Sequence, residues 1–194
     1  LQAYAHQSED KKTLTFFYDK QRSSRDGTTW SINDQKEVDG TMVPAWVGTE
    51  DAPDGDIIKA VFDASFKDFR PTTTASWLQS LLALETVEGL ENLNTSQVTN
   101  MSRMFYDNIA LKAIDLSHFQ TENVTNMSRM FYRCLELKKL NISNFNTEKV
   151  KDMESMFEHC TMLEWVNLTN FQMGAASSIF RMFKDCENLT TIFC

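Results

Sequence analysis

The stretch VTNMSRMFYRCLELKKLNISNFNTEK, at residues 124–149, decides the fold because its pattern occurs repeatedly along the chain. Its first eight residues recur unchanged at 98–105, as VKDMESMF at 150–157 and, less closely, as ASSIFRMF at 176–183, so the spacing is 26 residues. A period of roughly 20 to 50 residues is typical of repeats that stack into coils around a shared core. Such a stack offers a long surface and no inherent catalytic cleft, so we expect binding rather than catalysis.

The first half of each copy predicts a short helix. Met127, Met130, Phe131 and Cys134 are spaced i, i+3, i+4 and i+7, which places them on one helical face. Asn126 precedes this face, and its side chain can accept a hydrogen bond from an N–H of the first turn. The equivalent N-cap positions in the four copies are Asn100, Asn126, Asp152 and Ser178.

The second half of each copy predicts a strand. Leu140 and Ile142 alternate with Asn141 and Ser143, as expected when one face of a strand is buried and the other is solvated. A strand, a turn, a helix and a second turn then make one coil. We therefore predict an α/β fold in which polar columns stand on the outer face of a parallel sheet.

The chain divides into two regions. Residues 1–72 lack the repeat and contain apolar, partly alternating runs at 13–18 and 57–62 separated by turn-forming residues, which predicts a small β-rich N-terminal capping region. A degenerate copy begins at Thr73, and the repeats from 73 to 194 predict about four to five coils.

The last copy ends within a predicted strand, at residues 192–194. A terminal coil without a polar cap exposes apolar surface. We therefore expect the chain to be a fragment of a longer array that associates end to end with itself through the open C-terminal coil.

Composition excludes some classes of partner. The formal net charge is −8 and no basic stripe is present, which disfavours nucleic acid. No stretch approaches the roughly 18 apolar residues of a membrane span, so we expect no membrane insertion of this chain. Cys134, Cys160 and Cys186 are each 26 residues apart, which favours a column of buried free thiols over disulfides or a metal ladder.

No motif predicts catalysis, a cofactor or a metal. The acidic run at 50–56 could offer oxygen ligands to Ca²⁺, but its spacing does not match an EF-hand and we expect a solvated loop. His6, His118 and His159 share no motif with a nucleophile or a metal ligand, so we interpret them as structural. Seven Asn-x-Ser/Thr triplets fall mostly at repeated cap and turn positions, where they serve the backbone rather than glycosylation.

The pattern VTNMSxMFxxCxxLxxLxISxFxT at 124–147 resembles the repeat of the BspA-like leucine-rich repeat surface proteins of host-associated bacteria, also called the mycoplasma-lipoprotein-type repeat. The resemblance covers residues 73–194. It implies a right-handed, leucine-rich-repeat-like β/α solenoid on a bacterial surface or secreted protein, with a lipid anchor in the full-length precursor. It also implies adhesion to a protein or glycan ligand on a host or bacterial surface, without catalytic residues.

The outward-facing columns of the predicted sheet are the candidate ligand-binding surface, and Trp165 is its most informative member, because aromatic residues contribute disproportionately to interfaces. The alternative is that these polar side chains only solvate the sheet and bond to the backbone. The candidate residues are Asp115, Ser117, Lys139, Asn141, Ser143, Trp165, Asn167 and Thr169.

Two other classes of function fit the same sequence. An intracellular protein-interaction scaffold would use the same architecture, and a signal for secretion or lipid attachment in the precursor would distinguish the two. A glycan-active enzyme would need two carboxylates at a set separation, and no pair among the 27 acidic residues is singled out.

Overall fold

The computed structural model describes residues 1–38, 40–172 and 178–194, and these residues contain no α-helix. The helices present are three short 3-10 turns, η1 (Arg22–Ser24), η2 (Ala64–Asp68) and η3 (Leu90–Asn92). The strands form three small, separate sheets. The prediction of an α/β right-handed leucine-rich-repeat-like β/α solenoid is therefore wrong, because the described part of the chain has no helical layer and no continuous sheet closes around it.

The largest sheet has five strands in the order β3-β1-β2-β6-β7. Its members are β1 (Gln2–Gln7), β2 (Thr13–Asp19), β3 (Thr28–Ser31), β6 (Lys59–Phe62) and β7 (Thr86–Glu88). β1 pairs antiparallel with β2 and β3, whereas β6 lies parallel to β2 and β7. The predicted apolar runs at 13–18 and 57–62 correspond to β2 and β6.

An aromatic cluster backs this sheet. Phe16 stacks on Phe62 with ring centroids 4.5 Å apart and on Trp77 at 5.4 Å. Because Trp77 belongs to the first, degenerate repeat, the same apolar interior continues from the sheet into the repeats. The division of the chain at residue 72 stays a prediction. Strand β7, which lies after residue 72, completes the five-stranded sheet.

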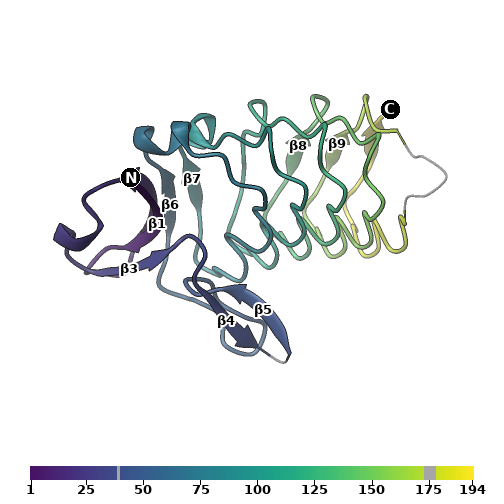
Figure 1. Cartoon of the computed structure of the whole chain (residues 1–194). Coiled ribbons are helices and arrows are strands. Elements are labelled where there is room, and N and C mark those ends of the chain that lie inside the picture. The colour runs from purple at the N-terminus through teal and green to yellow at the C-terminus, as the bar shows by residue number, and fades with distance from the viewer. Residues whose placement is uncertain (39, 173–177) are drawn as a thin grey trace.

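A separate hairpin projects from the start of the repeats (Figure 1). It consists of β4 (Gln35–Val38) and β5 (Thr41–Pro44), paired antiparallel. Trp46, which follows β5, anchors it by donating its indole N–H to the carbonyl of Trp77 at 2.8 Å.

Successive repeats lie side by side in register (Figure 1). Parallel bridges join Thr73 to Asn100, Asn100 to Asn126, Asn126 to Asp152, and Asp152 to Ser178. On the other side of the stack, β8 (Lys139–Asn141), β9 (Trp165–Asn167) and β10 (Thr191–Phe193) form a parallel three-stranded sheet. Residues 113–116 occupy the equivalent place one copy earlier and form no strand, although the repeat pattern predicts one. Residues 176–177, the first two of the last copy, lie outside the described residues.

The segment predicted as a helix is a series of tight turns, and its hydrogen bonds explain why. The N–H groups of Arg129, Phe131 and Arg133 donate to carbonyls of the next repeat, each at 2.9 Å. The N–H groups between them donate three residues back within the same repeat. Arg129 and Arg133 have φ angles of 55° and 56°, which no right-handed helix contains.

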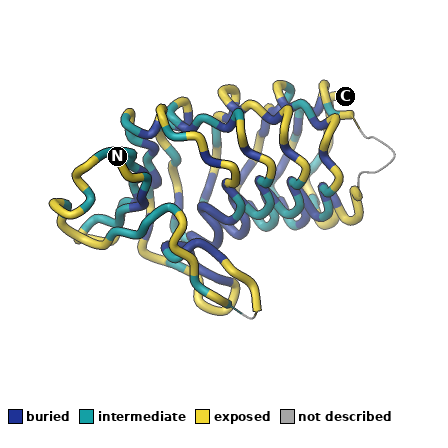
Figure 2. The backbone as a smooth tube through the Cα atoms, viewed as in Figure 1, coloured by how far each residue is buried: buried dark blue, intermediate teal, exposed yellow. Residues whose placement is uncertain are grey.

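The interior is a set of columns in which equivalent side chains lie over one another. Phe105, Phe131, Phe157 and Phe183 stack with centroid separations of 5.5, 5.6 and 5.2 Å, and Met104, Met130 and Met156 are fully buried. Figure 2 shows buried positions recurring at matching places in successive repeats. The predicted shared interior is confirmed, although turns rather than helices supply it.

The cysteine column follows the same rule. Cys134 and Cys160 are buried, Cys186 is half-buried, and each thiol donates to a phenylalanine carbonyl of the preceding repeat at 2.9–3.2 Å. Burial raises the pKa of Cys186 to about 11, and it also raises the pKa values of Cys134 and Cys160 well above the ordinary value of a thiol. These thiols therefore act as small buried side chains rather than nucleophiles.

Among the described residues, no helix has the length and apolar character needed to cross a bilayer.

Candidate binding surface

The outward positions of the three-stranded sheet define what we call the β8–β10 face: Lys139, Asn141, Trp165, Asn167, Thr191 and Phe193. Leu140 and Val166 point inward and are buried, so strand alternation turns their neighbours outward. The register pairs Lys139 with Trp165 and Asn141 with Asn167. The structure thus brings four of the eight predicted residues onto adjacent strands.

The polar residues at the ends of these strands bond to their own backbone. Asn141 Oδ1 accepts from the Ser143 amide at 3.2 Å, and Asn167 Oδ1 accepts from the Thr169 amide at 3.1 Å. Asp115 makes the same contact with Ser117 at 2.9 Å, and this backbone hydrogen bond lowers the pKa of Asp115. These side chains therefore bond to their own backbone, as the alternative interpretation of these columns predicts.

Trp165 is half-buried and packs edge-to-face on Phe193, with centroids 5.9 Å apart and an interplanar angle of 82°. Phe193 is 49% exposed. Sequence reasoning missed Phe193 as a member of the surface, although its place two residues after the equivalent of Trp165 in the last copy was a usable signal. The two rings form an aromatic pair at one end of the face.

A hollow of about 400 Å³ adjoins this face at Thr169. Its other polar lining residues are amides that already serve the fold. Asn144 Nδ2 donates to the carbonyl of Leu116 at 3.0 Å, and Asn146 Oδ1 accepts from the Glu148 amide at 2.9 Å. The hollow is thus a groove between repeats in which Asn144 bonds to the preceding repeat and Asn146 bonds within its own turn.

The stacking of repeats also brings together a cluster of charged side chains that the sequence spacing did not predict. His159 Nδ1 lies 3.3 Å from Asp185, and its Nε2 lies 3.8 Å from Glu158. These three side chains could offer ligand atoms to a metal. The Lys184 ammonium already contacts both carboxylates, at 3.2 Å to Glu158 and 3.5 Å to Asp185. Against the effect of burial, hydrogen bonds from Ser155 and then Lys184 lower the pKa of Glu158. We therefore interpret the cluster as an ion-pair network.

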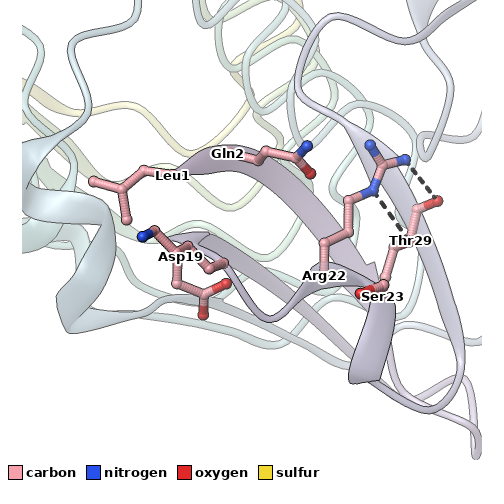
Figure 3. Close-up of a pocket in the computed structure, with 7 residues that line it drawn as sticks. Leu1, Gln2, Asp19, Arg22, Ser23 and Thr29 are labelled. Atoms are coloured by element: carbon pink, nitrogen blue, oxygen red, sulfur yellow. Dashed lines mark hydrogen bonds between the residues drawn. The ribbon is translucent and has the colours of Figure 1, made fainter.

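A further hollow, of about 480 Å³, lies beside β1 and β2 near the first residue (Figure 3). Two of its charged side chains already have partners: Arg22 donates to Thr29 Oγ1 at 3.3 Å, and Asp19 binds Arg25 at 2.7 Å. Tyr4 also donates to Asp19, at 2.7 Å. The hollow is a polar surface depression without unpaired charge among these groups.

Residues 75–192, more than half of the chain, match the family described as "Mycoplasma protein of unknown function, DUF285", and the chain belongs to this family. No curated protein matches it. Among solved structures, it is similar to a leucine-rich cell surface protein from Faecalibacterium prausnitzii A2-165, with 15% sequence identity and a TM-score of 0.40. That alignment covers 97% of this chain and 52% of the other, so the chain spans about half the length of that protein.

Proposed function

We propose that the chain is a non-enzymatic binding module of a bacterial cell-surface or secreted protein. In this proposal it recognises a protein or a glycan on a host or bacterial surface through the β8–β10 face. The BspA-like pattern of the repeat supports the compartment and the adhesive role. The Trp165–Phe193 aromatic pair, presented on the neighbouring strands β9 and β10, is the single observation that supports the choice of face.

The rigid scaffold behind the β8–β10 face favours binding. Side chains held by a stacked scaffold lose little conformational entropy on binding, so more of the contact energy appears as affinity. Recognition in this proposal extends over several repeats, because Lys139, Trp165 and Thr191 come from three successive copies in register.

The experiment is a binding screen of the chain against immobilised fibronectin, collagen and mucin glycans. We expect Trp165→Ala to weaken the interaction that is found by about 30-fold, because truncating an aromatic hot-spot residue costs roughly 2 kcal/mol. Asn141→Ala should weaken it less. Met42→Ala is the matched control, since Met42 is 54% exposed on the distant hairpin.

Unchanged binding by Trp165→Ala and Asn141→Ala would show that another face is used. Absence of binding to every surface tested would contradict the adhesive role. Protease accessibility of the protein on intact cells tests the compartment, since an intracellular scaffold would be protected.

We also propose self-association through the last repeat. Ile179, Phe180 and Ile192 are 49%, 60% and 42% exposed there, and β10 is an edge strand. Exposed apolar side chains and an edge strand on the same repeat favour docking of a second copy. Sedimentation equilibrium should show a dimer that Phe180→Glu dissociates and Met42→Glu does not. A monomer at all concentrations would refute this.

A further inference from the structure

A small cavity lies where the loop at 49–51 and the β4–β5 hairpin meet the first repeats. Its volume is about 190 Å³, and water occupies about 30 Å³ per molecule in the liquid, so the cavity suits a compact ligand. It lies apart from the β8–β10 face. The side chains that matter for its chemistry are Thr49, Glu50, Asp51, Gln79, Arg103 and Tyr106.

The loop that carries the two carboxylates is held in place by the repeat below it. The amide of Asp54 donates to the carbonyl of Ser80 at 2.9 Å, and the amide of Leu82 donates to the carbonyl of Asp54 at 2.8 Å. Gly48 permits this approach, because a Cβ there would lie 2.3 Å from the Ser80 oxygen. The loop that forms this wall of the cavity is therefore held in one position by the repeat against which it packs.

Gln79 supplies the observation that points to a ligand. The residue is 4% exposed and lines the cavity, yet its Oε1 has no hydrogen-bond partner within the described part of the chain. A buried amide oxygen without a partner costs about 1–3 kcal/mol. Because no bond holds this oxygen, the amide can turn it toward a donor that enters the cavity.

The cavity is also lined by charged groups of both signs, Arg103 and Asp51, which are not paired to one another. In the described residues, the Arg103 guanidinium has no carboxylate within ion-pair distance and instead lies over the Tyr106 ring, 5.4 Å from its centroid. The Asp51 carboxylate likewise has no partner among them. A free cation and a free anion lining one small cavity match a ligand that carries both charges.

Tyr106 and Glu50 complete the lining. Tyr106 donates its hydroxyl to Glu50 Oε2 at 3.3 Å, and its ring is stacked on Tyr132 at 4.8 Å. Burial, followed by the negative charge of Glu50, raises the pKa of Tyr106 to about 12. The phenol therefore stays neutral, and the Glu50 carboxylate keeps acceptor capacity for an ammonium group.

We propose that this cavity binds a small α-amino acid as its zwitterion. The ammonium group is placed at Asp51, Glu50 and the turned Gln79 oxygen, and the carboxylate is placed at Arg103. The limited volume favours an amino acid as small as glycine or alanine. This site is independent of the proposed adhesive function.

The experiment is a titration of the isotopically labelled chain, monitored by amide chemical shifts, with L-alanine up to about 20 mM, a range suited to millimolar affinity. Acetate and ethylammonium serve as probes of each half of the ligand. We expect shifts confined to 48–52, 79–80 and 103–107, with binding at least about tenfold tighter for alanine than for either half.

Three variants give distinct readouts. Gln79→Met should abolish the shifts while leaving the unfolding temperature equal or higher, because it removes a buried unpartnered oxygen at nearly constant volume. Arg103→Gln should weaken binding by at least about tenfold. Arg129→Gln, the equivalent position one repeat later, should bind as the parent does.

Several results would overturn the proposal: no shift with alanine or glycine, shifts that map elsewhere, equal binding of acetate or ethylammonium alone, or unchanged binding in Gln79→Met. Destabilisation of Gln79→Met would assign the side chain a structural role instead. Loss of binding in Arg129→Gln would show a non-specific charge effect.

Discussion

At the scale of single residues, the fold depends on residues whose backbone φ angles lie in the left-handed region. Each repeat places two of them four positions apart, and none is glycine: Ser76 and Ser80, Arg103 and Asp107, Arg129 and Arg133, Ser155 and His159, Arg181 and Asp185. This conformation costs roughly 1–2 kcal/mol for an L-residue. The hydrogen bonds between repeats and the buried apolar columns offset that cost.

Arg129 tests this conformational requirement. Arg129→Val should be less stable than Arg129→Gly by about 1–2 kcal/mol in urea unfolding, because valine resists a positive φ and glycine accepts it. Both variants lose the 3.4 Å ion pair with Glu154, so their difference reports the backbone alone. Equal stabilities would mean that position 129 does not hold the left-handed conformation in solution.

The sequence reveals the polar chemistry of these turns but not their shape. Asn100, Asn126 and Asp152 were predicted to accept a backbone N–H, and each accepts from the residue two positions on at 2.9 Å. An Asx-turn and a helix N-cap use the same side-chain oxygen, so the residue type alone does not distinguish them.

At the scale of elements, the predicted helix failed because periodicity reports which side chains are buried, not which carbonyl each amide reaches. Met127, Met130, Phe131 and Cys134 are all buried, as the i, i+3, i+4, i+7 pattern indicates. The adjacent repeat offers equivalent carbonyls to every second amide, and this competes with the helix. The strands at 139–141 and 165–167 were predictable, since alternation there has no such competitor.

One candidate surface could be predicted from the sequence and the other could not. Columns at 26-residue spacing could be predicted, so Asn141 and Asn167 were placed beside each other from sequence alone. The cavity at Gln79 could not be, because it depends on where a non-repeating hairpin packs against the first repeats.

A column of threonines joins the turns between repeats. Thr121 is buried, and its hydroxyl both donates to the carbonyl of Asn146 at 2.9 Å and accepts from the amide of Asn146 at 2.7 Å. Thr95 makes the same pair with Gln120, and Thr147 with Gln172. One hydroxyl therefore satisfies two backbone groups of the next repeat.

Thr121→Val should lower the free energy of unfolding by about 1–3 kcal/mol, because it leaves the partly buried amide and carbonyl of Asn146 without their partner at almost unchanged volume. Thr121→Ser keeps the hydroxyl and should lose less. Chemical denaturation measures both variants. If the serine variant is destabilised as much as the valine variant, the methyl group rather than the hydrogen bonds holds the turn.

At the scale of the whole molecule, stacking in register turns a short local pattern into an extended surface. Each added repeat places one more residue in every outward column and one more phenylalanine in the interior stack, so the face and its support grow together. That coupling is the physical basis of the proposed recognition over several repeats.

The most direct test is detection of scalar couplings across individual hydrogen bonds by NMR. The central claim is that alternate amides of each turn segment bond to the next repeat rather than to a helix. The N–H of Phe131 should therefore couple to the carbonyl carbon of Met156, and that of Arg129 to Glu154. Coupling of the Phe131 amide to the carbonyl of Met127, as in an α-helix, would contradict the account.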